Sequence, residues 1–284
     1  MATITPTIRL RRLGMALRDH REAAGLTLDE AARVLMRSPS SLSRIEKGLH
    51  HVPVRDLEYI LGKYGVTDPA VTDRLFDWCR NGRKKGWWQR YATDLSPEMM
   101  DFIGLEADAT TIDFFEVMLI PGLLQTEEYA RALIKAGPFA NASDRVERLV
   151  AIRMKRQEVL SRAHPPRIHA VVDEAAVRRR VGGSSTMKRQ LQHLIEAYEA
   201  PNTTLQILPL ELGEYQGMTG AFTIMNIATP GDLSLVTVDS LTSISYREEF
   251  EDVHAYLAAF ERLHTKALSK YRSRTMIEGL MSQL

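Results

Sequence analysis

The sequence predicts an α+β fold, with an all-α N-terminal domain followed by a mixed α/β C-terminal domain. A chain of 284 residues is long for one domain and suits two. The first 82 residues contain helix start and stop signals without a strand pattern, whereas β-branched and aromatic runs begin near residue 111. We therefore predict one domain at 1–82, a connecting segment at 83–97 and a second domain at 98–284.

Five short helices are predicted in the first domain. Their apolar residues recur every three or four positions, and glycine or proline marks most of their ends. Thr27 and Glu30 have the spacing of a capping box, in which each side chain accepts a hydrogen bond from the backbone NH of the other residue. The predicted helices are 7–24, 27–35, 38–48, 53–64 and one from Asp68 into the basic tract RNGRKKGWWQR.

The second domain alternates strand and helix patterns. Runs of β-branched and aromatic residues predict strands, and amphipathic segments with capping residues predict helices. The predicted strands are 111–119, 167–173, 203–209, 221–227, 233–239 and 243–247. The predicted helices are one capped by Thr126, 144–162, 185–200, one with an apolar seam at Phe250, Val253, Leu257 and Phe260, and a last one with Met276, Ile277, Leu280 and Leu284.

The second and third predicted helices form a helix-turn-helix pattern. This motif needs two helices held at a fixed angle by a short corner, so that the second can lie in the major groove of DNA. Ala32 is small where the helices cross, and Leu35, Leu42 and Ile45 can form the buried contact. The corner residue is Met36, where the motif normally has a glycine with positive φ. A left-handed methionine costs on the order of 1 kcal/mol, so a longer or differently shaped turn is the alternative.

The outer face of the third helix is rich in hydroxyl and basic groups, and its one acid is Glu46. Serine hydroxyls and helix N-terminal amides suit phosphates, while arginine recognises guanine O6 and N7. We expect Arg44 to read a base, Ser40 and Ser41 to contact base edges or phosphate, and Lys47 and Arg37 to contact phosphates. The predicted DNA-contacting set is Arg37, Ser38, Ser40, Ser41, Ser43, Arg44 and Lys47.

The charge of the chain is divided unevenly. Residues 1–90 hold 17 Lys and Arg against 10 Asp and Glu (+7), and residues 91–284 hold 20 against 26 (−6). A basic first part suggests a polyanionic partner such as double-stranded DNA, and chance clustering on a solvated face is the alternative. No apolar run reaches about 18 residues. The N-terminus also lacks the apolar core of a secretory signal, so we expect a cytoplasmic protein without a membrane partner.

The sequence indicates no catalytic site and no metal site. The 8 histidines lack metal-ligand spacing, and no P-loop, nucleotide fingerprint or nucleophile elbow occurs. The single cysteine, Cys79, is expected to be a buried apolar residue. Asp173 and Glu174 are interpreted as a helix cap and a first-turn acid, and Gly182-Gly183 as a turn rather than a phosphate site. We therefore expect no cofactor and no enzymatic activity.

Residues 9–65 resemble the lambda-repressor-like, or XRE-type, helix-turn-helix domain on the stretches LRDHREAAGLTLDEAA, SPSSLSRIEKG and LEYILGKYGVTDP. Further blocks, of which PGLLQTEEYARAL is the most specific, resemble an actinobacterial regulator family that joins such a domain to a C-terminal domain of unknown function, as in WhiJ-like regulators. The resemblance implies a transcriptional regulator, usually a repressor, often encoded beside a small partner protein in an antitoxin-like arrangement. In the phage-repressor type of this domain, an acid at the position of Glu46 pairs with an arginine at the position of Arg21. The resemblance therefore implies an Arg21–Glu46 salt bridge, and a loose surface pair is the alternative.

The sequence leaves the assembly of the chain and the role of its C-terminal domain open. We expect a homodimer that reads half-sites roughly 10 bp apart. The C-terminal domain either binds a small partner protein or senses a small molecule, and its aromatic residues either line a pocket or form a core. These aromatic residues are Phe114, Phe115, Tyr129, Tyr215 and Phe222.

Two further pairs of residues have alternative interpretations. Trp87 and Trp88 are interpreted as a hydrophobic hinge, with stacking beside Arg83, Lys84 and Lys85 as the alternative. His50 and His51 are interpreted as loop residues rather than DNA contacts.

Overall fold

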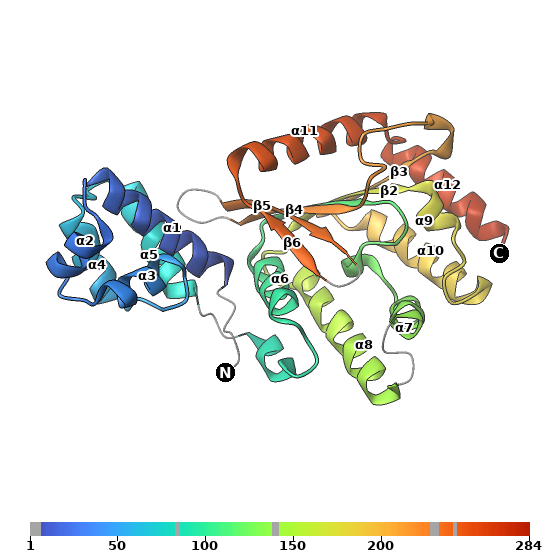
Figure 1. The fold of residues 1–284 in the computed structure, drawn as a ribbon. Helices are drawn as coiled ribbons and strands as arrows, with labels where there is room; N and C mark the ends of the chain where they lie inside the picture. The colour runs from blue at the N-terminus through green and yellow to red at the C-terminus, as the bar shows by residue number, and fades with distance from the viewer. Residues whose placement is uncertain (1–6, 83–85, 138–141, 228–232, 241–242) are drawn as a thin grey trace. The chain divides into compact units, whose positions relative to one another are not determined.

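The computed structural model describes residues 7–82, 86–137, 142–227, 233–240 and 243–284 (Figure 1). The chain forms two compact units, of which the first extends to Arg90 and the second begins at Tyr91. This division falls inside the connecting segment predicted at 83–97. The first unit is helical and the second is a mixed sheet with helices, which confirms the predicted α+β class. None of the described helices has the length and hydropathy that a membrane crossing requires.

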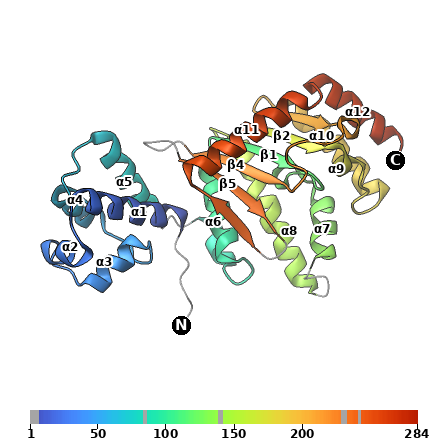
Figure 2. The ribbon, with the colours of Figure 1, turned by 45° about the horizontal axis from the view of Figure 1, so that its top comes forward.

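The first unit contains five helices that form where the sequence predicts them. They are α1 (Ile8–Ala23), α2 (Leu28–Val34), α3 (Pro39–Glu46), α4 (Val54–Lys63) and α5 (Pro69–Asn81). Helix α1 packs against both α3 and α5 (Figure 2). The capping box is present, since Thr27 N donates to Glu30 Oε2 at 2.9 Å and Thr27 Oγ1 accepts from Glu30 N at 3.3 Å. Cys79 is fully buried in this core, as predicted, and its thiol donates to the carbonyl of Val52.

The second unit is built on one six-stranded sheet with the order β3-β2-β1-β4-β5-β6. Its strands are β1 (Thr111–Glu116), β2 (Arg167–Asp173), β3 (Thr203–Leu208), β4 (Phe222–Ile227), β5 (Leu233–Asp239) and β6 (Ile244–Arg247). Strands β1, β2 and β3 are parallel neighbours, whereas β4 runs antiparallel to β1 and β6 runs antiparallel to β5. In this register Phe115 lies opposite Val171 on one side and Phe222 on the other.

Helices cover both faces of this sheet. They are α6 (Pro97–Asp108), α7 (Glu127–Ala136), α8 (Ser143–Gln157), α9 (Glu174–Arg178), α10 (Ser184–Glu199), α11 (Phe250–Lys266) and α12 (Lys270–Ser282). Helix α11 lies along one face, and α6, α8 and α10 lie on the other (Figure 1). Short 3-10 turns occupy Trp87–Tyr91, Gly122–Leu124, Glu158–Ser161 and Leu210–Leu212.

The structure differs from the sequence-based expectation in four places. The strand expected at 111–119 ends at Glu116, because the chain then bends and exposes Met118 and Leu119 before Pro121. The helix expected at 144–162 ends at Gln157 and continues as a 3-10 turn. Phe250 was expected in an apolar seam, but it lies in the first turn of α11 with 75% of its surface exposed. Helix α6 was not predicted, although Ser96 caps it and Pro97 starts it.

Candidate nucleic-acid interface

The corner between α2 and α3 is a Schellman turn around Met36. The NH of Arg37 donates to the carbonyl of Ala32 at 2.8 Å, and the NH of Met36 donates to that of Arg33 at 3.1 Å. Met36 has a φ of 53°, and its side chain projects into solvent. Of the two alternatives drawn from the sequence, the structure therefore has the left-handed methionine. Ser38 then begins α3, because its Oγ accepts from the NH of Ser41 at 3.2 Å.

Helix α3 is held in place on two sides. Ala32, Leu35, Leu42 and Ile45 are buried between α2 and α3, as the motif predicts. On the other side α1 crosses the C-terminal end of α3 so closely that a Cβ added to Gly14 would lie 2.6 Å from the carbonyl oxygen of Ile45. These contacts fix the direction of α3 and leave one long face of it in solvent.

The solvent face of α3 presents the predicted hydroxyl and basic groups. Ser38, Ser40, Arg44 and Lys47 are exposed, and Ser41 and Ser43 are half-buried at the edge of the same face. Within the described part of the chain, the side chains of Arg44 and Lys47 form no hydrogen bond and no ion pair. Both cations are therefore available to an external anion.

Arg37 differs from the other members of the predicted set. Its guanidinium forms an ion pair with Asp56, the third residue of α4. A DNA phosphate would have to share Arg37 with this carboxylate or displace it. No local pattern in the sequence indicates this contact, because the two residues are 19 positions apart.

Arg21 and Glu46 join α1 to the end of α3. The Arg21 Nε lies 2.7 Å from Glu46 Oε1 and its Nη2 lies 3.1 Å from Oε2, which makes the pair bidentate. The two side chains are only 8% and 7% exposed. The remaining Arg21 nitrogen donates to the carbonyl of Leu26 at 2.8 Å. The hydrogen bonds to Glu46 raise the pKa of Arg21.

Several other residues considered at the sequence level have structural roles. The ring of His51 is hydrogen-bonded to the carbonyl of Cys79. Trp88 is buried with its ring edge-on to Trp87, whereas Arg83, Lys84 and Lys85 lie outside the described residues. Gly182 and Gly183 have φ values of 69° and 87° in the turn before α10. Asp173 caps α9 and also accepts from the Tyr215 hydroxyl, and Glu174 accepts from the NH of Leu210.

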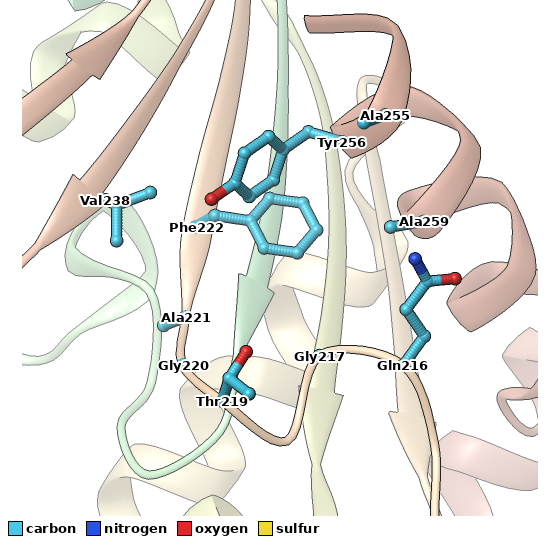
Figure 3. Close-up of a pocket in the computed structure, with 10 residues that line it drawn as sticks. All are labelled: Gln216, Gly217, Thr219, Gly220, Ala221, Phe222, Val238, Ala255, Tyr256 and Ala259. Carbon is cyan, nitrogen blue, oxygen red and sulfur yellow. The ribbon is translucent and has the colours of Figure 1, made fainter. Parts of the chain in front are cut away.

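The aromatic residues of the second unit mostly form its core. Phe114, Phe115 and Tyr129 are buried. Phe222 is also buried, and it lines a cavity of about 250 Å³ between α11 and the loop 216–221, together with Tyr256 (Figure 3). In this view the Tyr256 ring stands beside Phe222, and Gln216 and Thr219 border the space from the loop. The second unit therefore has both an aromatic core and room for a small ligand.

Comparison with known families assigns both parts of the chain. The family described as "Helix-turn-helix domain" matches residues 12–75. The family described as "Domain of unknown function (DUF5753)" matches residues 99–279. No curated protein and no solved structure matches the chain. The first unit is therefore a DNA-binding helix-turn-helix domain.

Proposed function

Because the chain belongs to the DUF5753 family and places a helix-turn-helix domain before it, we propose that it is a sequence-specific transcriptional regulator. The observation that supports this proposal best is the solvent face of α3, where Arg44 and Lys47 extend beside serines from a helix that α1 and α2 hold rigidly. A regulator of this kind acts in the compartment that holds the chromosome, so its place is the cytoplasm.

Selection of bound fragments from random DNA tests this function directly. The full chain is expected to enrich one sequence motif, and its affinity for that motif is expected to fall steeply as salt concentration rises. Enrichment of no motif, together with no DNA binding at low ionic strength, would contradict the proposal.

The finer assignment is that of a homodimeric, antitoxin-like repressor of the actinobacterial WhiJ type, in which the second unit responds to a small partner protein. The support is the sequence resemblance and the net charge of −6 on residues 91–284, which suits a basic partner surface. Purification of the tagged chain from its native host is expected to recover a small protein in stoichiometric amount. Recovery of the chain alone would count against a partner-dependent role.

A small-molecule sensor is the second candidate, and the cavities of the second unit favour it. We assign no catalytic reaction and no cofactor to either form of the regulator. A thermal-shift screen separates the two candidates, because a ligand that binds only the native state raises the melting temperature.

A further inference from the structure

The second unit contains a cavity of about 310 Å³ on the side of the sheet that α6, α7 and α8 cover. Its walls come from these three helices, from Leu95 and Gly137 beside them, and from the segment 119–125, so all of it lies within one unit. The size is at the lower end of the range for small-molecule sites in proteins.

Most of the wall is apolar and partly open to solvent. Leu95, Met99, Leu133, Ile134 and Leu149 are each only half-buried, although each faces its neighbours across the cavity. Half-exposed apolar side chains around one concave space lose water when an apolar group enters, which favours binding by about 25 cal/mol per Å² buried. The wall therefore suits an aliphatic chain or a small ring.

The guanidinium of Arg153 lines the same cavity. Its Nη1 donates to Gln125 Oε1 at 2.9 Å, and it forms no ion pair with any described residue. Gln125 is itself fixed, because its amide nitrogen donates to the carbonyl of Ile120 at 2.7 Å. Gly122 leaves room for the guanidinium, since a Cβ there would lie 2.9 Å from Arg153 Nη1.

Charges at longer range act on Arg153: Glu106, Glu116 and Asp239 attract its guanidinium and Arg156 repels it, but none of these carboxyl groups forms an ion pair with it. Arg156 also reaches the cavity, but Glu106 binds it in a bidentate ion pair with distances of 2.9 and 2.7 Å. Burial raises the pKa of Glu116 to about 8, which leaves this carboxyl largely protonated at neutral pH. Burial lowers the pKa of Arg153 to about 10, so its guanidinium stays charged but is poorly solvated.

We propose that this cavity binds a small amphiphile with one carboxylate, whose apolar part lies against α6, α7 and α8 and whose carboxylate pairs with Arg153. The pair would form two charge-assisted hydrogen bonds in a partly dehydrated site, the geometry in which arginine and carboxylate bind most strongly. The site adds a class of ligand to the proposed regulator. Only the biological consequence of binding rests on the proposed function, because ligand binding is measured in the absence of DNA.

Calorimetric titration of the full chain with octanoate tests the site, with octanol as the neutral probe of equal chain length. Octanoate is expected to bind and to raise the melting temperature, and octanol is expected to bind about tenfold or more weakly. Equal binding of the two probes, or no binding of octanoate at millimolar concentration, would overturn the proposal. DNA binding that fails while octanoate binds would reject the regulator and leave the site intact.

Two variants and one control variant test whether the probes bind in this cavity. Arg153→Met is expected to weaken octanoate about tenfold and to leave octanol unchanged, while Lys155→Met, on the same helix but outside the cavity, is expected to change neither. Leu133 is a half-buried residue of the cavity wall, and Leu133→Trp places a larger side chain there. This variant is expected to abolish binding of both probes, which keeps the test decisive if Arg153→Met fails to fold. Wild-type octanoate affinity in folded Arg153→Met or Leu133→Trp would place the ligand elsewhere.

Discussion

At the scale of single residues, variants of Arg44 and Lys47 distinguish sequence-specific binding from non-specific binding to DNA. Arg44→Ala is expected to lose roughly 1–3 kcal/mol of binding free energy and to relax preference at one base pair. Lys47→Ala is expected to weaken all sequences alike and to flatten the plot of log affinity against log salt by about one unit. Titrations of the selected operator and of single-base variants at several salt concentrations measure both effects. Unchanged affinity and preference in Arg44→Ala would remove α3 from the groove.

The buried pair of Arg21 and Glu46 has a matched control on the same helix. Arg21→Ala leaves the Glu46 carboxylate buried without a partner and is expected to cost about 3–5 kcal/mol of unfolding free energy. Arg18 pairs with Glu22 at 2.9 Å, but these side chains are 61% and 50% exposed, so Arg18→Ala is expected to leave the unfolding free energy nearly unchanged. Urea unfolding of both variants checks the difference, and equal costs would show that burial of the pair has no energetic effect.

Met36 offers a stabilising change. Its φ of 53° is a left-handed conformation that glycine adopts without steric cost, and its exposed side chain packs against little. Met36→Gly is therefore expected to raise the unfolding free energy by up to about 1 kcal/mol, less the extra entropy of glycine in the unfolded chain. Thermal unfolding followed by circular dichroism measures this, and a loss of more than about 1 kcal/mol would mean that the methionine side chain stabilises the corner.

At the scale of elements, the end of β1 makes stability depend on pH. Burial, followed by repulsion from Asp239, raises the pKa of Glu116 from 4.5 to about 8. Between these two pH values, Glu116 is protonated in the folded chain but ionised in the unfolded chain. The stability that Glu116 contributes is therefore complete below about pH 4.5 and is lost as the pH rises through about 8. Glu116→Gln is expected to melt at a higher temperature than wild type at pH 9 but not at pH 5. An equal difference at both pH values would exclude titration of Glu116 as the cause.

Local chemistry explains which elements the sequence could predict. Helices α2 and α3 were predicted nearly to the residue, because Thr27 and Ser38 are caps that act within one turn. The end of β1 and the exposure of Phe250 were missed, since both depend on what the rest of the sheet covers. Periodicity identifies strands but says nothing about their order, so the parallel and antiparallel halves of the sheet were not predictable.

The candidate sites show the same division. The Arg21–Glu46 pair could be proposed because the resemblance supplied a contact between residues 25 positions apart. No sequence pattern indicates the contact of Arg37 with Asp56, and none indicates the position of Arg153 beside Gln125. The residues on the solvent face of α3 followed from helical spacing, whereas the contacts that individual side chains make, such as that of Arg37 with Asp56, followed only from the fold.

At the scale of the whole molecule, the proposed division of functions follows the distribution of charge. The basic first unit contains the helix-turn-helix domain, and the acidic second unit contains the two cavities. In the proposed homodimeric regulator, the second unit would couple a signal to the way in which two copies of the first unit bind the operator, since a single helix-turn-helix reads only one half-site.

This coupling predicts a strict dependence on half-site spacing. If the chain binds as a homodimer, its operator has two half-sites roughly 10 bp apart on one face of the duplex. Insertion of 5 bp turns one half-site to the opposite face, because B-DNA completes a turn in about 10.5 bp, and is expected to reduce affinity roughly 100-fold by removing the second contact. Destroying one half-site should give the same loss. Gel-shift titrations measure both, with analytical ultracentrifugation as the control for the dimer, and affinity that ignores the insertion would mean that each copy binds alone.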